Sequence, residues 1–187
     1  VPLGEAWIPL DGTWQFKEVG SDRWELAEVP GVVHTDLMRS GRIPDPYRDS
    51  NVDSVQWVEN KDWEYERTFD LQPGSIDRDY VELVFKGLDT FAEARFNDSL
   101  VGTTNNMFRT WPFPVKGVLV EGANRLRITF RSAVTKGSES LVAYGRPLPA
   151  DNDRGDVKVS PFVRKAGVHF GWDFAPRLVT CGIWRSV

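Results

Sequence analysis

Hydrophobic and polar residues alternate with a period of two along much of this chain, which is typical of strands that bury one face. The clearest case is 124–131, where Leu126, Ile128 and Phe130 fall on one face and polar residues lie between them. The same alternation predicts three further strands, at 63–71, 80–85 and 91–96. In the first of these, Arg67 interrupts the apolar face and is expected near its edge.

Turn-forming sequences separate these runs, as expected for neighbouring antiparallel strands. Gln-Pro-Gly stands at 72–74 and Glu-Gly-Ala-Asn at 121–124, and Asn97-Asp98-Ser99 reads better as a hairpin turn than as a glycosylation sequon. Short strands with one solvent-exposed face and one buried face favour an all-β fold, a sandwich of two antiparallel sheets.

Helical patterns are scarce. They are confined to 33–40 and to 133–144, where Gly137 weakens the second helix. The segment 146–155 reads as a long polar loop rather than a linker. One or two short helices are therefore expected beside the sheets.

The composition fits one domain with a substantial core. The chain has 187 residues, 41% of them hydrophobic, with 8 Trp and 11 Phe, and β-sandwiches often remain undivided up to about 250 residues. Four tryptophans in strand-like runs are expected in the core: Trp14, Trp57, Trp63 and Trp184.

The net charge of −4, with mixed signs, argues against binding to nucleic acid or to an anionic membrane surface. No apolar run approaches the roughly 20 residues of a membrane helix, and no signal peptide begins the chain. Cys181, the only cysteine, excludes a disulfide framework. It is compatible with a bacterial cytoplasmic protein, but it leaves the compartment open.

The candidate chemistry lies in the run 169–176, His-Phe-Gly-Trp-Asp-Phe-Ala-Pro. An indole can pack against the C–H face of a sugar, and a neighbouring carboxylate can accept two charge-assisted hydrogen bonds from hydroxyls. The alternative is that Trp172 is a core residue and Asp173 caps a turn. His34 and His169 do not stand in a ligand-spaced motif, so no metal site is expected, and Cys181 reads as a small core residue.

Motifs along nearly the whole chain resemble the N-terminal domain of the β-mannosidases of glycoside hydrolase family 2. Near the C-terminus the similar segments are 162–165, 169–173 and 180–185. Upstream, similar segments follow in the family's order at 29–37, 41–47, 56–57, 62–65, 87–90 and 105–108.

The resemblance implies that residues 1–187 form a single jelly-roll-like, galactose-binding-like sandwich. Immunoglobulin-like and TIM-barrel catalytic domains would follow it in the same polypeptide. The family's two catalytic glutamates lie on that barrel, and the acid/base follows an Asn, whereas this chain contains no Asn-Glu dipeptide. The chain by itself therefore has no expected catalytic residue, needs no cofactor and should be inactive, although the parent protein would be a glycosidase.

The resemblance also assigns substrate-binding residues. Asp173 would accept hydrogen bonds from the terminal non-reducing β-mannose, and Trp172 would form one side of the same subsite. The chain would share this substrate with the catalytic domain. Asn51 is a weaker candidate, since it could equally satisfy its own turn. The chain departs from the usual family form at Phe174-Ala175, where Trp-Gly is common, and both changes lie after Asp173.

Two other functions stay open. An autonomous carbohydrate-binding module would need a row of exposed aromatic residues. A structural packing or dimerisation domain would bury Trp172 and pair Asp173 with Arg164, Lys165 or backbone amides. We expect Arg164 and Lys165 to form an ordinary solvated face and His169 to orient the Trp172 loop through a hydrogen bond.

Overall fold

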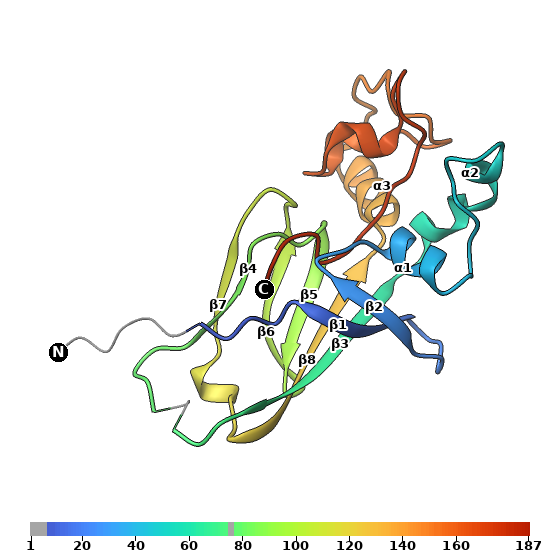
Figure 1. Cartoon of the computed structure of the whole chain (residues 1–187). Coiled ribbons are helices and arrows are strands. Elements are labelled where there is room, and N and C mark those ends of the chain that lie inside the picture. The colour runs from blue at the N-terminus through green and yellow to red at the C-terminus, as the bar shows by residue number, and fades with distance from the viewer. Residues whose placement is uncertain (1–6, 75–76) are drawn as a thin grey trace.

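The computed structural model describes residues 7–74 and 77–187 and consists mainly of two antiparallel sheets (Figure 1). The larger sheet has the strand order β2-β1-β3-β8-β5-β6. Its strands are β1 (Gly12–Glu18), β2 (Glu25–Val29), β3 (Trp63–Leu71), β8 (Gly122–Arg131), β5 (Phe91–Phe96) and β6 (Ser99–Asn105). The smaller sheet pairs β4 (Glu82–Phe85) with β7 (Trp111–Pro114). This arrangement confirms the predicted all-β sandwich.

The helices lie at the edges of this sandwich. α2 (Asn51–Ser54), α3 (Ala133–Tyr144) and the loops between 146 and 180 gather beyond one end of the larger sheet, whereas α1 (Val33–Arg39) follows β2 (Figure 1). The 3-10 turns are η1 (Gln56–Asn60), η2 (Lys116–Val118), η3 (Ser160–Phe162) and η4 (Gly167–Phe170). No helix in the described part of the chain is long and apolar enough to cross a membrane.

The strands with clear alternation form as predicted. β5 has the predicted bounds, β3 covers 63–71, and β8 buries Leu126, Ile128 and Phe130. Arg67 does interrupt the apolar face of β3, and its guanidinium donates to the carbonyl oxygens of Leu10 and Asp11 at 2.6 and 2.7 Å. A polar side chain is thus accommodated at the margin of the core.

The hairpin turn between β5 and β6 also matches the prediction. Asn97 and Asp98 form a two-residue connection, and both have positive φ, +46° and +66°. Such a turn matches the twist of the strands that it joins, and Asn and Asp tolerate the left-handed conformation.

The prediction differs from the structure in several segments. The β1–β2 hairpin and α2 were not predicted, and Trp57 lies in η1 rather than in a strand, although it packs against the core. Next to Cys181, Gly182 forms an isolated antiparallel bridge with Asp89. β1 in fact alternates, since Trp14 and Phe16 are buried between exposed or half-buried neighbours.

A main core fills the space between the sheets, and a smaller one lies under α3. In the main core the Tyr65 ring packs against Phe16 and Phe130, each with its centroid 5.7 Å away. The smaller cluster consists of Ala133, Val159, Val163, Phe170 and Val179. Gly137 belongs in α3 for this reason, because a Cβ there would come within 2.7 Å of Val159. This second cluster fixes the segment 159–179, which carries the candidate site.

Candidate functional site

Trp172 and Asp173 lie on an exposed loop that follows η4. The Trp172 side chain is 42% exposed and contacts Phe174, whose ring centroid is 6.4 Å away and which is 77% exposed. The Trp172 amide donates to the Ala175 carbonyl at 3.0 Å and closes a turn around Asp173. Among the described residues, no hydrogen bond or ion pair involves the Asp173 carboxylate. The indole and the carboxylate are therefore both open to solvent.

Gly171 sets the direction in which this loop leaves η4. Its φ is +108° with ψ 152°, a conformation that is essentially restricted to glycine. A Cβ at this position would also lie 3.0 Å from the Arg154 side chain. The Arg154 Nη2 in turn donates to the Trp172 carbonyl at 2.5 Å. Gly171 thus lets Arg154 approach and hold the start of the loop.

Arg177 anchors the other end of the loop. The guanidinium is buried and donates to Asp153 Oδ1 at 2.5 Å and to Glu59 Oε1 at 3.0 Å. It also lies over the Phe170 ring, 5.5 Å from the centroid. Burial raises the pKa of Glu59, and the Arg177 cation opposes that rise. One cation therefore joins the loop to η1 and to the long polar loop 146–155.

A second buried ion pair lies beneath η4. Lys165 is buried, and its Nζ donates to Asp89 Oδ2 and to the Thr180 carbonyl, the latter at 2.8 Å. The expectation of a solvated face is wrong for Lys165 but holds for Arg164, which is exposed. Burial lowers the pKa of Lys165, and the Asp89 carboxylate opposes this effect. The chain bends at this point, where the Lys165 amide donates to the Val163 carbonyl at 2.8 Å, and the two adjacent basic side chains differ in burial.

Both histidines face this ion pair. His169 Nδ1 lies 3.7 Å from Asp89 Oδ2, too far for a hydrogen bond, so the side chain faces the ion pair rather than the Trp172 loop. His34 is buried, on α1. Burial, followed by the Lys165 cation, lowers the pKa of each histidine to about 4. Both imidazoles are therefore neutral at pH 7.

Asn51 begins α2, which lies beyond the same end of the larger sheet as the loops between 146 and 180 (Figure 1). Its Nδ2 donates to the Asp45 carbonyl at 3.0 Å. The adjoining η1 reaches the loop base, since Gln56 Nε2 donates to the Arg177 carbonyl at 2.9 Å. The amide nitrogen of Asn51 is thus used within its own turn, and its oxygen is the atom that could meet a ligand.

A metal-binding cluster of three or more His, Cys, Asp or Glu side chains does not occur among the described residues. Cys181 packs against the core, and burial raises the pKa of its thiol well above the ordinary value. A thiol with a raised pKa is a poor nucleophile at neutral pH. The interpretation of Cys181 as a core residue agrees with this environment.

The sequence reasoning missed the residues that hold the loop, namely Gly171, Arg154, Arg177, Asp153 and Glu59. Gly171 was the one with a local signal, as a flexible residue directly before Trp172. The partners of Arg177 lie 24 and 118 residues away in the chain. No local pattern could have joined them.

The comparisons with known proteins agree with this architecture. The sequence profile described as "Glycosyl hydrolase 2 galactose-binding domain-like" matches residues 14–185. The chain is 36% identical over 184 residues to a β-mannosidase of Mus musculus and 38% identical over 183 residues to β-mannosidase B of Thermothelomyces thermophilus. These alignments cover 95% and 96% of this chain, but 21% of each relative.

A solved structure with a similar fold is the β-D-mannosidase of Dictyoglomus thermophilum, with a TM-score of 0.91 and 43% sequence identity. The match covers 96% of this chain and 22% of that one, so this chain spans about a fifth of the length of its relatives. With the profile matching most of its length, the chain belongs to the galactose-binding-like N-terminal domains of glycoside hydrolase family 2.

Proposed function

We propose that this chain is the N-terminal sandwich domain of an exo-acting, retaining β-mannosidase that hydrolyses terminal non-reducing β-D-mannose residues. In this proposal it completes the substrate pocket of a downstream catalytic barrel in the same polypeptide, after an immunoglobulin-like domain. The relatives of 36–43% identity, all named β-mannosidases, support the substrate class. Their much greater length supports the presence of further domains.

The observation that carries the proposal is the exposed Trp172–Asp173 pair on an anchored loop. The Asp173 carboxylate would accept hydrogen bonds from hydroxyls of the terminal mannose, and the Trp172 indole would cover the C–H face of the ring. Arg154 and Arg177 hold the two ends of the loop before any ligand arrives. A loop that is already ordered loses less conformational entropy on binding.

The chemistry itself would belong to the barrel. Retaining glycosidases use two carboxyl groups about 5–5.5 Å apart, one as nucleophile and one as acid/base. In this proposal both are glutamates of the downstream domain, and the present chain supplies recognition alone. A loop that closes over the terminal sugar would block longer chains at that end, which would make the enzyme exo-acting.

Asn51 is the second residue proposed to reach the sugar. Its Nδ2 is held by the Asp45 carbonyl, which would leave Oδ1 to accept a hydroxyl hydrogen bond. The same hydrogen bond is also what a purely local role in the turn requires. Asn51 therefore adds to the proposal but does not carry it.

The test is an Asp173→Ala substitution in the full-length parent protein, assayed with an aryl β-mannoside. Loss of a charged hydrogen-bond acceptor costs about 1.5–3 kcal/mol, so kcat/KM should fall roughly ten- to a hundredfold. Asp156→Ala is the matched control, because Asp156 is likewise an exposed aspartate, directly after the long polar loop 146–155. Equal kcat/KM values for wild type and Asp173→Ala would contradict the proposed role.

An autonomous carbohydrate-binding module is the second candidate, favoured by the paired rings of Trp172 and Phe174. Two rings on one loop offer much less contact than an extended row of aromatic residues. We therefore expect calorimetry of the isolated chain with methyl β-mannoside to show no specific binding. Strong and specific binding by the isolated chain would favour the autonomous module instead.

A further inference from the structure

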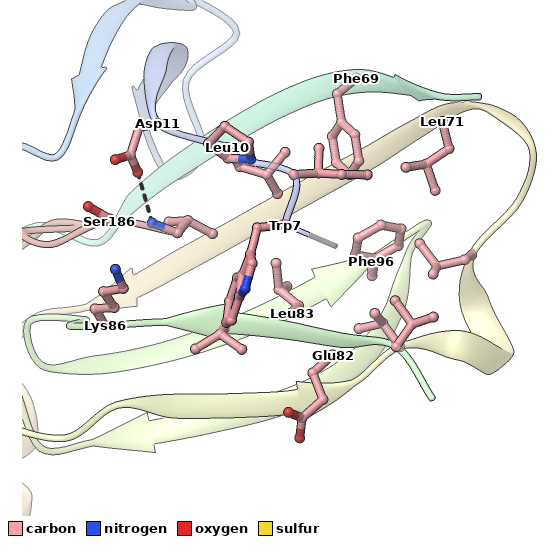
Figure 2. A pocket seen from close by; sticks show the side chains of 17 residues that line it. Trp7, Leu10, Asp11, Phe69, Leu71, Glu82, Leu83, Lys86, Phe96 and Ser186 are labelled. Carbon is pink, nitrogen blue, oxygen red and sulfur yellow. Dashed lines mark hydrogen bonds between the residues drawn. The ribbon is translucent and has the colours of Figure 1, made fainter. Parts of the chain in front are cut away.

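An apolar groove lies beside β4, apart from the Trp172 loop (Figure 2). Its volume is about 380 Å³, and its lining includes Trp7, Leu83 and Phe96 but no residue of α2, η1 or the loop 170–177. Most residues of this lining are apolar, and burying the hydroxyls of a sugar without hydrogen-bond partners is costly. The polar groups around the Trp172 loop are therefore better suited to shape a sugar site.

The loop 170–177 is closed at its base by a backbone hydrogen bond. The Leu178 amide donates to the His169 carbonyl at 2.9 Å, which brings the two ends of the loop together. The carbonyl of the same peptide group, that of Arg177, accepts from Gln56 Nε2 at 2.9 Å. The peptide group between Arg177 and Leu178 is thus held from both sides.

Gln56 also contacts the segment that carries Asn51. Its Nε2 donates to the carbonyl of Val52, the residue after Asn51 in α2, at 2.8 Å. Both acceptors of the Gln56 side chain are carbonyls, so only its amide nitrogen, which carries two hydrogens, can face them. One amide group therefore bridges α2 and the end of the loop that carries Asp173.

Glu59 reinforces this contact from the same 3-10 turn. Residues three apart lie one above the other in a 3-10 helix, so Gln56 and Glu59 share a face of η1. Glu59 Oε1 accepts from Arg177 Nη2 at 3.0 Å, while Gln56 donates to the carbonyl of the same arginine. η1 therefore holds Arg177 by its side chain and by its backbone.

η1 is itself fixed to the core of the sandwich. Val58 is buried, and its carbonyl accepts from Trp63 Nε1 at 3.2 Å. The Trp57 ring lies beside that of Trp63, with 6.1 Å between the centroids. Ser132 Oγ donates to the Glu59 carbonyl at 2.6 Å. The Trp172 loop is thus attached to a turn that the main core already holds in place.

We propose that Gln56 is a positioning residue of the proposed sugar site. It attaches the base of the Trp172 loop to η1 and α2, so that the Asp173 carboxylate and the Asn51 side chain keep one relative arrangement before the sugar arrives. This role rests on the proposed function, because Gln56 does not touch the sugar and acts through Asp173. Contacts that are ordered beforehand lose less entropy on binding, and a small displacement of one of them can lower the rate strongly.

The test is a double-mutant cycle in the full-length parent protein, with Gln56→Met, Asp173→Ala and the double variant assayed on an aryl β-mannoside. Methionine has a similar length but lacks both N–H donors. We expect Gln56→Met to lower kcat/KM at least about fivefold beside Asp173 and less than about twofold in the Asp173→Ala background, because groups that act as a unit are not additive. Gln72→Met is the matched control and should leave kcat/KM unchanged, since Gln72 is exposed and follows β3 at the end away from η1.

The cycle separates the positioning role from the sugar contact. A loss in Asp173→Ala without a loss in Gln56→Met would overturn the positioning role and leave the sugar contact intact. Equal losses from Gln56→Met in both backgrounds would mean that Gln56 supports the fold alone, and the positioning role would again fail. Full activity in Asp173→Ala would remove the sugar contact and the positioning role together.

Amide hydrogen exchange in the same full-length variants provides a readout that does not depend on catalysis. Without the Gln56 bond the peptide group of Leu178 is held on one side only, so its amide should exchange at least about fivefold faster in Gln56→Met than in Gln72→Met. Ile128, buried in β8, is the internal reference and should exchange equally in both. Gln56→Glu, whose carboxylate also lacks N–H donors, should reproduce the change. Unchanged exchange at Leu178 in both Gln56 variants would contradict the proposal.

Discussion

The charged residues of the larger sheet and those beneath the Trp172 loop use ion pairs in opposite ways. On the outer face of the sheet, Arg127 donates to Glu66 at 2.7 Å, directly across from it on the neighbouring strand. Its side chain is 29% exposed. Beneath the loop, Lys165 and Asp89 are fully buried, and they lie 76 residues apart in the chain.

The difference shows what specifies each region. Backbone pairing and the burial of an apolar face align the strands of the sheet. The ion pairs on its outer face are therefore not needed to form it. The loop region has only a small apolar cluster. Its chain path is held by buried ion pairs between residues that are far apart in the sequence. Exposed ion pairs contribute little, whereas a buried charge that has lost its partner is strongly destabilising.

The largest effect is expected from Lys165→Met. This change leaves the Asp89 carboxylate buried without its cation, which costs about 3–5 kcal/mol in the free energy of unfolding. Chemical denaturation monitored by tryptophan fluorescence measures the loss. Arg164→Met is the matched control, because the neighbouring basic side chain is exposed and should change stability by less than about 0.5 kcal/mol. Equal losses in the two variants would remove the distinction between the regions.

A smaller effect is expected from acid. The pKa values of His34 and His169 are about 4 in the folded protein, and that of an unfolded histidine is about 6.5. Between these values the unfolded state binds more protons, so stability is lost as the pH falls from 6.5 toward 4. Each histidine should contribute about 2 kcal/mol to the loss between pH 7 and pH 4.5.

Urea denaturation across this pH range tests the prediction. The double substitution His34→Gln and His169→Gln should flatten the decline. Asp36 and Glu59, whose pKa values burial raises, bind protons more readily when folded and oppose the decline at the acid end. An unchanged pH dependence in the double variant would show that the histidines are not its source.

The smallest effect is expected from Arg127→Gln on the outer face of the sheet. The guanidinium pairs with Glu66, but water reaches both groups, so the free energy of unfolding should fall by about 0.2–1 kcal/mol. Its sensitivity to salt distinguishes this pair from the buried one, since exposed pairs are screened. A loss as large as that of Lys165→Met would contradict the comparison.

The parts predicted well from the sequence share a local cause. Period-two alternation in 91–96 and 124–131 reports directly which side chains face the core, and it located β5 and β8. The bounds of α3 and the hairpin turn at Asn97–Asp98 were likewise encoded in adjacent residues. The exposed position of Trp172 and Asp173 agrees with the loop that was expected, although their role in binding sugar stays a prediction.

The amino-acid sequence by itself determined that this chain forms amphipathic strands joined by tight turns. Both features depend on adjacent residues, since successive side chains of a strand point to opposite faces. The tertiary structure alone decided the strand order, the burial of Lys165 and the contact of Arg177 with Glu59. A lysine next to an exposed arginine carries no local mark of burial. It is buried because Asp89 and Thr180, far away in the chain, supply a charge and a carbonyl that replace water.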